Sequence, residues 1–408
     1  MKIRSITSFY DPGISNADYT LEILANLAKE GQKICIDNGY EVQSLRLATI
    51  PFSLIKPGND DEELIKLTKS MEIKAKNHGF EYLSLGPALL SNLDGYEVIN
   101  KLIAETEITF FSAVMADQIS GVNIKAIQNC AKIIHQNATI EPGGFANLRF
   151  SALANVDPFG PFFPGSYHQT GQPPSISIAI EGADDVVDAF QNAKNLMEAR
   201  QFLLDKLEHY ANELGLIFSE LLVDQKVVFQ GFDFSVAPFP VDHCSLGAAL
   251  EHLGVPFLGK HGSLAAAAFL TDTLDRGNWE RCGYNGLMLP LLEDSRLSQR
   301  SIDQTLSIKD LLMFSAVCGT GLDTIPIPGN TTVSQIEALL LDIAALSTRL
   351  KKPLTARLMP IPEKEAGDLT DFTFEYFSNG RVLALDADPL VGFFANPDET
   401  FKLKPRSG

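Results

Sequence analysis

Strand-like and helix-like segments alternate through the first third of this 408-residue chain. This alternation constrains the fold more than any other feature of the sequence. Continuous or alternating apolar runs predict strands at 3–9, 42–49, 80–85 and 108–114. Apolar residues at helical spacing predict helices at 16–38, 60–78, 96–104 and 122–135. Four β-then-α steps in succession indicate an α/β fold with a parallel sheet covered by helices.

The middle and the C-terminal part of the chain carry different patterns. Strands are predicted at 145–153 and 175–180, joined by a connection at 157–168 that is rich in Pro, Gly and Phe. A connection of this length is often functional. Further predictions are one long helix at 184–214, a helix after Gly262, a helix at 332–350 and a strand at 353–359. We expect one large α/β domain over residues 1–385 and a C-terminal tail over 386–408.

Charge and composition limit the kinds of partner that this protein is expected to bind. The net charge of -18 disfavours binding to nucleic acid and to anionic membranes. The longest apolar run, 264–270, is too short to span a bilayer. The five cysteines are widely spaced and form no CxxC pair, which favours a reducing, cytoplasmic location. The expected partner is therefore a small molecule. A homo-oligomer stays open.

Residues 315–332 combine a thiol, glycines, a carboxylate and prolines in a short space. We interpret this stretch as a loop between ordered elements, where binding and catalysis concentrate. Cys318 is a candidate nucleophile if its surroundings favour the thiolate, or else a small buried apolar residue. Asp323 is a ligand or a cap. Gly329 to Thr332 can bind an anion or merely cap the next helix.

Other candidate residues lie in strands and turns. Arg149, Arg357 and Glu181 fall in apolar strand-like runs, where a charge must be paired or must face a cavity. His261 lies between two glycines, either as a base or as an exposed residue at a helix start.

Two common ligand sites are not indicated. No nucleotide-binding glycine motif occurs at a strand-to-helix turn. His243 and His252 lie nine residues apart, which on a straight helix is about 13.5 Å, too far to share a metal ion. No metal site and no cofactor is therefore assigned from the residues.

Several stretches resemble the signatures of one family. Residues 318–329, 351–368, 160–168 (ending at His168) and 259–263 are similar to those of the family called domain of unknown function 711. The resemblance covers about residues 1–385. Members are grouped with the pyruvate formate-lyase-like barrels and carry the name PFL family protein. The resemblance thus implies a ten-stranded α/β barrel with surrounding helices and a central site.

The resemblance does not imply radical chemistry. Glycyl radical enzymes carry a C-terminal Arg-Val-x-Gly-aromatic motif. The nearest string here is Arg381-Val-Leu-Ala384-Leu385, which has neither the glycine nor the aromatic residue. Fold alone does not define function.

The combined hypothesis is an enzyme that acts on an anionic metabolite in a central barrel pocket. Cys318 is the expected nucleophile or acid/base, and His261 is its proton partner. The residues expected to bind the anion or to converge on it are Arg149, His168, Glu181, Asp323 and Arg357. A non-catalytic metabolite sensor and a metal-dependent hydrolase are the alternatives.

Overall fold

The computed structural model describes residues 1–55 and 61–406. Within them, 12 strands form one large, mostly parallel sheet. The strands are β1 (Lys2–Tyr10), β2 (Glu41–Val42), β3 (Leu45–Pro51), β4 (Tyr82–Gly86), β5 (Thr109–Asp117), β6 (Gly121–Asn123), β7 (Phe150–Ala154), β8 (Ser175–Glu181), β9 (Val228–Asp233), β10 (Gly321–Pro328), β11 (Leu354–Ile361) and β12 (Thr400–Phe401).

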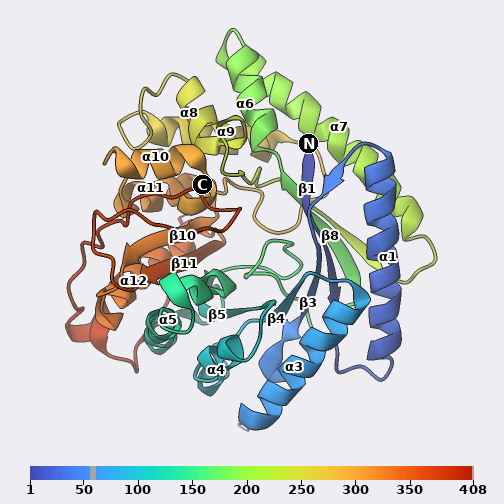
Figure 1. Cartoon of the computed structure of the whole chain (residues 1–408), viewed down its shortest axis with the longest axis horizontal. Coiled ribbons are helices and arrows are strands. Elements are labelled where there is room, and N and C mark those ends of the chain that lie inside the picture. Colours follow the sequence, from blue (N-terminus) through green and yellow to red (C-terminus); the bar gives the residue numbers. More distant parts are fainter. Residues whose placement is uncertain (56–60, 407–408) are drawn as a thin grey trace.

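Helices cover the outer face of this sheet, and the strands curve around the middle of the molecule (Figure 1). The helices are α1 (Ala17–Asp37), α2 (Phe52–Ile55), α3 (Asp61–His78), α4 (Ile99–Ala104), α5 (Ile124–Asn137), α6 (Ala183–Asn192), α7 (Leu196–Leu221), α8 (Leu246–His252), α9 (Ser263–Arg276), α10 (Ser295–Ile302), α11 (Ile308–Cys318) and α12 (Val333–Leu350). In the described ranges no helix is long and apolar enough to cross a membrane.

The order of the strands follows from the β-then-α steps of the first third. The main path is β10-β11-β7-β5-β4-β3-β1-β8-β9. Strands β1, β3, β4, β5 and β7 are mutually parallel. β8 and β9 are parallel to each other but antiparallel to β1, and β10 and β11 stand in the same relation to β7. The predicted α/β class is confirmed. Asp60, the first residue of the helix predicted at 60–78, lies outside the described residues.

Three local predictions were wrong. The predicted helix 184–214 is two helices, because Asn195 caps α7 by accepting the N–H of Glu198 at 3.1 Å. The predicted strand 145–153 begins only at residue 150, because Gly143 and Gly144 have positive φ and residues 142–149 form 3₁₀ turns.

The predicted loop over 315–332 is the end of α11, the strand β10 and the start of α12. Prolines 326 and 328 hide the strand in the sequence, since proline lacks an N–H for a ladder. The strand tolerates them because β10 ends the main strand path. Thr332 forms a capping box with Gln335, so this segment serves as a helix cap.

Residues 155–174, which we call the inner connection, run from β7 to β8 across the concave side of the sheet (Figure 1). The hydroxyls of Ser5 and Thr7 donate to the carbonyl of Pro161 at 3.4 and 3.2 Å. The hydroxyl of Ser84 donates to the carbonyl of Ser166 at 2.7 Å. Small polar side chains of the strands therefore hold this connection by its backbone.

A short irregular segment, residues 281–290, touches both ends of the main strand path. Arg281 forms a parallel bridge with Phe232 of β9, and Pro290 forms one with Asp323 of β10. Asp233 at the end of β9 accepts the N–H groups of Tyr284 and Asn285 at 2.7 and 3.0 Å. The segment therefore lies between the two outermost strands of the path.

Candidate functional site

A pocket of about 370 Å³ opens where the parallel strands β1, β3, β4 and β5 begin. Aromatic rings form much of its wall, and arginines and carboxylates also line it. The described aromatic lining residues are Tyr82, Phe110, Phe145, Phe162, Phe163, Phe374 and Tyr376. The described charged lining residues are Arg4, Arg46, Arg149, Arg357, Glu81, Glu107, Glu141, Glu293 and Asp323.

A chain of ion pairs joins two of these arginines. Glu293 accepts from Arg4 at 2.8 Å and from Arg357 at 2.9 Å. Arg357 also grips Asp323 with two N–H groups, at 2.5 and 2.9 Å. Arg4 reaches Glu181 at 2.9 Å. Arg4 and Arg357 are thus neutralised by protein carboxylates.

The same contacts set the pKa values of the two arginines. Burial alone disfavours the charged form of Arg357, but the nearby charges of Asp323 and Glu293 outweigh it and raise the pKa. In Arg4 burial is likewise outweighed by Glu293 and Glu181, and the pKa is raised. Burial raises the pKa of Glu181 despite its contact with Arg4. Both arginines are therefore permanent cations.

Arg46 differs from its neighbours because no carboxylate pairs with it anywhere in the described part of the chain. Its Nε–H donates to the Ser44 hydroxyl at 2.9 Å. Its guanidinium lies over the rings of Tyr82 and Phe163, 5.5 and 5.3 Å from their centroids. Burial and the charge of Arg4 lower the pKa of Arg46 to about 10. It remains a cation at neutral pH, with N–H donors left over.

Arg149 lines the pocket but its donors are used within the protein. It donates to Glu141 at 2.6 Å and to the Ile103 carbonyl at 2.9 Å. It also donates to the Thr106 hydroxyl at 3.2 Å. These bonds tie Arg149 to other parts of the protein, so few of its N–H groups remain to hold a ligand.

Glu181 lies one contact behind the pocket. It ends β8 and contacts the pocket lining through Arg4 and Gln43. Its Oε2 accepts from Gln43 at 2.5 Å, whereas its buried Oε1 has no partner among the described residues. Glu181 therefore supports Arg4 from behind.

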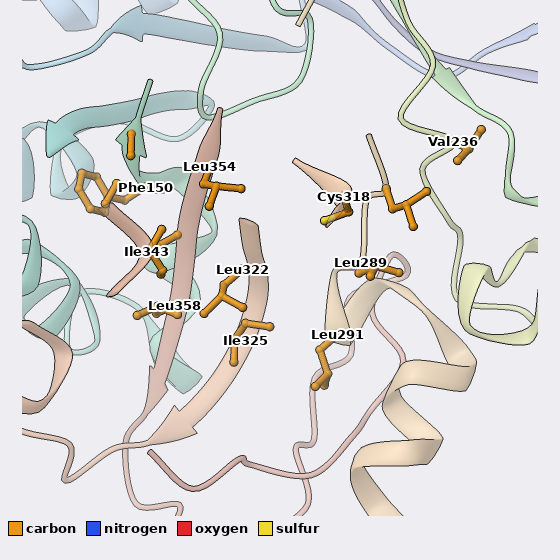
Figure 2. Close-up of a cluster of buried hydrophobic side chains, with 14 of the residues drawn as sticks. Phe150, Val236, Leu289, Leu291, Cys318, Leu322, Ile325, Ile343, Leu354 and Leu358 are labelled. Carbon is orange, nitrogen blue, oxygen red and sulfur yellow. The ribbon is translucent and has the colours of Figure 1, made fainter. Parts of the chain in front are cut away.

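Cys318 lies in the hydrophobic core and does not line the pocket. Figure 2 shows it in the same apolar cluster as Leu289 and Leu322. Its Sγ contacts the Thr320 hydroxyl at 3.6 Å. It is the last residue of α11, so the free N–H groups of a helix N-terminus are not beside it.

The two candidate histidines lie apart from the pocket. His261 is exposed on the turn before α9. His168 is buried in the inner connection, where its Nε2 is 3.2 Å from the Gln172 carbonyl and its ring packs edge-on against Phe159. The structure therefore brings together Arg149, Asp323 and Arg357, with Glu181 behind them.

Sequence reasoning missed Arg4, Arg46 and Glu293. The two arginines interrupt strand-like runs at 3–9 and 42–49, which is the same signal that singled out Arg149 and Arg357. Glu293 lies in a short turn, and nothing local marks it. Over residues 1–55 and 61–406, no group of three or more His, Cys, Asp or Glu residues could hold a metal ion.

The comparison with known proteins gives the family. The model of a family described as "Uncharacterised ACR (DUF711)" matches residues 1–378. A UPF0210 protein of Pyrobaculum arsenaticum is 29% identical over 91% of this chain and 86% of its own length. A UPF0210 protein of Pyrobaculum aerophilum is 31% identical over 89% of this chain and 82% of its own. The chain belongs to the DUF711 family.

Proposed function

We propose that this protein binds a small anionic molecule in the pocket at the starts of β1, β3, β4 and β5. The observation that carries the proposal is Arg46, a guanidinium in the pocket wall without a carboxylate partner among the described residues. Burying part of a charge without a partner is costly. A ligand anion would restore the missing pairing, and the guanidinium fork suits a carboxylate or a phosphate.

Arg4 and Arg357 line the same pocket, and in the proposal they hold its wall in place. Their ion pairs with Glu293 and Asp323 fix the positions of these four lining side chains. The charge of Arg4 also adds to the positive potential that Arg46 experiences. The proposal assigns no reaction, and it does not use Cys318, which lies outside the pocket lining.

The proposal includes the ten-stranded barrel that the resemblance implies. Nine strands form the main path, and residues 281–290 bridge to both of its ends. We propose that this segment takes the place of the tenth strand of the barrel. A closed barrel would keep Pro290 and Asp323 beside each other at the pocket, which would hold the lining in place.

Thermal unfolding with a panel of small carboxylates and phosphates tests the proposal. A ligand at about 100 times its Kd stabilises the protein by about 2.7 kcal/mol. We expect a hit with the wild type and with Arg276→Met, and no hit with Arg46→Met. Arg276 is a suitable control because it lies on α9 and pairs with Asp272. A hit that Arg46→Met retains, or no hit at all, contradicts the proposal.

A further inference from the structure

Glu81 is a second unpaired charge at the same pocket. It lies at the exposed mouth, immediately before β4. One carboxylate oxygen accepts the backbone N–H of Leu45. No lysine, arginine or histidine of the described chain forms an ion pair with it. The other mouth carboxylates are already paired, Glu107 with Lys76 at 2.7 Å and Glu141 with Arg149 at 2.6 Å.

Arg46 lies on β3 and Glu81 immediately precedes the neighbouring strand β4, yet the two side chains form no ion pair with each other. Arg46 is directly opposite Tyr82 in the β3–β4 ladder, one residue from Glu81. Each side chain makes other contacts. Arg46 donates to Ser44 and lies over two aromatic rings, and Glu81 accepts the N–H of Leu45. Arg46 and Glu81 therefore line one pocket without a direct ion pair, although the charge of Arg46 acts on the Glu81 carboxylate.

The wall beside these two charges is apolar. Phe110 and Phe163 pack edge-on with their centroids 5.5 Å apart. Phe162 and Met288, which pack together in a second apolar cluster, also line the pocket. Such a wall suits a hydrocarbon or aromatic group and gives a polar group no partner.

We infer that the ligand is a zwitterionic α-amino acid with an apolar side chain. Its carboxylate would take the free fork of Arg46, its ammonium would take Glu81, and its side chain would lie against Phe110, Phe163 and Met288. This inference rests on the proposed function and adds the ligand class to it. One ligand of this kind satisfies both unpaired groups at once.

The remaining charges argue against a polyanion. Arg4 and Arg357 are already neutralised by Glu293, Asp323 and Glu181. A second negative group on the ligand would meet carboxylates and, among the described lining residues, no further unpaired guanidinium. A dicarboxylate or a phosphate ester should therefore bind more weakly than a monocarboxylate that carries an ammonium group.

Calorimetric titration with matched probes tests the inference. The probes are L-phenylalanine and L-leucine, their des-amino acids 3-phenylpropanoate and 4-methylpentanoate, and phenethylamine, which lacks the carboxylate. We expect at least one amino acid to bind the wild type at least ~10-fold tighter than its des-amino acid, a difference of about 1.4 kcal/mol. In Glu81→Gln, whose amide oxygen can still accept the Leu45 N–H, that ratio should fall to about one. Arg46→Met should bind neither the amino acid nor its des-amino acid.

Glu105→Gln serves as the control, because Glu105 pairs with Lys69 at 2.8 Å and does not line the pocket. It should keep the wild-type ratio. A des-amino acid that binds as tightly as its amino acid, or an unchanged ratio in Glu81→Gln, overturns the inference. So does the absence of any amino acid binding. In each case the proposed function survives if another anion binds in a manner that Arg46→Met abolishes, so the two failures are distinguishable.

Discussion

Arg357 is the residue on which the ion pairs of the pocket depend most. It pairs with Asp323 and Glu293, and the side chains of all three are largely buried. Glu293 also has Arg4, but the only ion pair of Asp323 among the described residues is with Arg357. Removing this arginine leaves an uncompensated buried carboxylate, whereas removing an exposed arginine does not.

We therefore expect Arg357→Met to lower the free energy of unfolding by about 3–5 kcal/mol. Arg276→Met, on the exposed face of α9, should change it by no more than about 0.5 kcal/mol. Urea unfolding of both variants beside the wild type measures this difference. A loss of less than about 1 kcal/mol in Arg357→Met would show that the ion-pair chain adds little.

The core position of Cys318 gives a second expectation at this scale. The side chain is 3% exposed and packs with apolar neighbours. The native protein should therefore react with iodoacetamide at Cys318 only through unfolding, far more slowly than a free thiol. Mass spectrometry of the alkylated peptide over time checks this. Rapid labelling of the native protein would return Cys318 to the candidates for a nucleophile.

At the scale of elements, the inner connection depends on His168 being neutral. Its ring is buried and its Nδ1 has no partner among the described residues. Burial lowers its pKa below the ordinary 6.5, although the Gln172 carbonyl acts in the opposite direction. As the pH falls below 6.5, the unfolded chain takes up a proton that the folded chain does not. The contribution of His168 to stability is therefore present above this pH and lost as the pH falls.

His168→Gln should remove this part of the pH dependence. The wild type should lose more stability than the variant between about pH 7.5 and 5.5, a range that spans the ordinary histidine pKa. Unfolding curves at several pH values measure the difference between the two proteins. Parallel pH profiles of the wild type and the variant would be inconsistent with a neutral, buried His168.

The elements themselves were predictable where a local pattern defines them. The first four β-then-α steps follow from apolar spacing, which depends only on neighbouring residues. β10 was missed because Asp323 and prolines 326 and 328 interrupt its apolar run. The break between α6 and α7 was missed because no glycine or proline marks it, only the cap at Asn195.

At the scale of the whole molecule, Asp233 ties β9 to residues 281–290. Four donor groups reach its carboxylate, from the backbone and hydroxyl of Ser235 and the backbone of Tyr284 and Asn285. Complete burial raises its pKa from 3.8 to about 6, although these hydrogen bonds act in the opposite direction. The folded state therefore holds this proton more tightly, and the associated stability is present below pH 3.8 and lost as the pH rises through about 6.

Asp233→Asn, which cannot ionise, should not show that loss. The free energy of unfolding of the wild type should fall relative to that of Asp233→Asn as the pH rises from 3.8 to about 6. Chemical denaturation of both proteins over this range measures how the difference in their free energies of unfolding changes with pH. A destabilisation by the amide that is the same at every pH does not affect this change. A relative change of the opposite sign would mean that the hydrogen bonds outweigh burial.

The sequence by itself determined the order of the elements in the first third, the α/β class and the kinds of charged residue that a pocket could use. Only the tertiary structure decided which arginine is free. Arg46, Arg149 and Arg357 look alike in the sequence, since each is a charge within a strand-like run. Their difference comes from partners that are remote in sequence, such as Glu293 and Asp323, 64 and 34 residues from Arg357. Ion pairing depends on distance in space, and local sequence does not encode that distance.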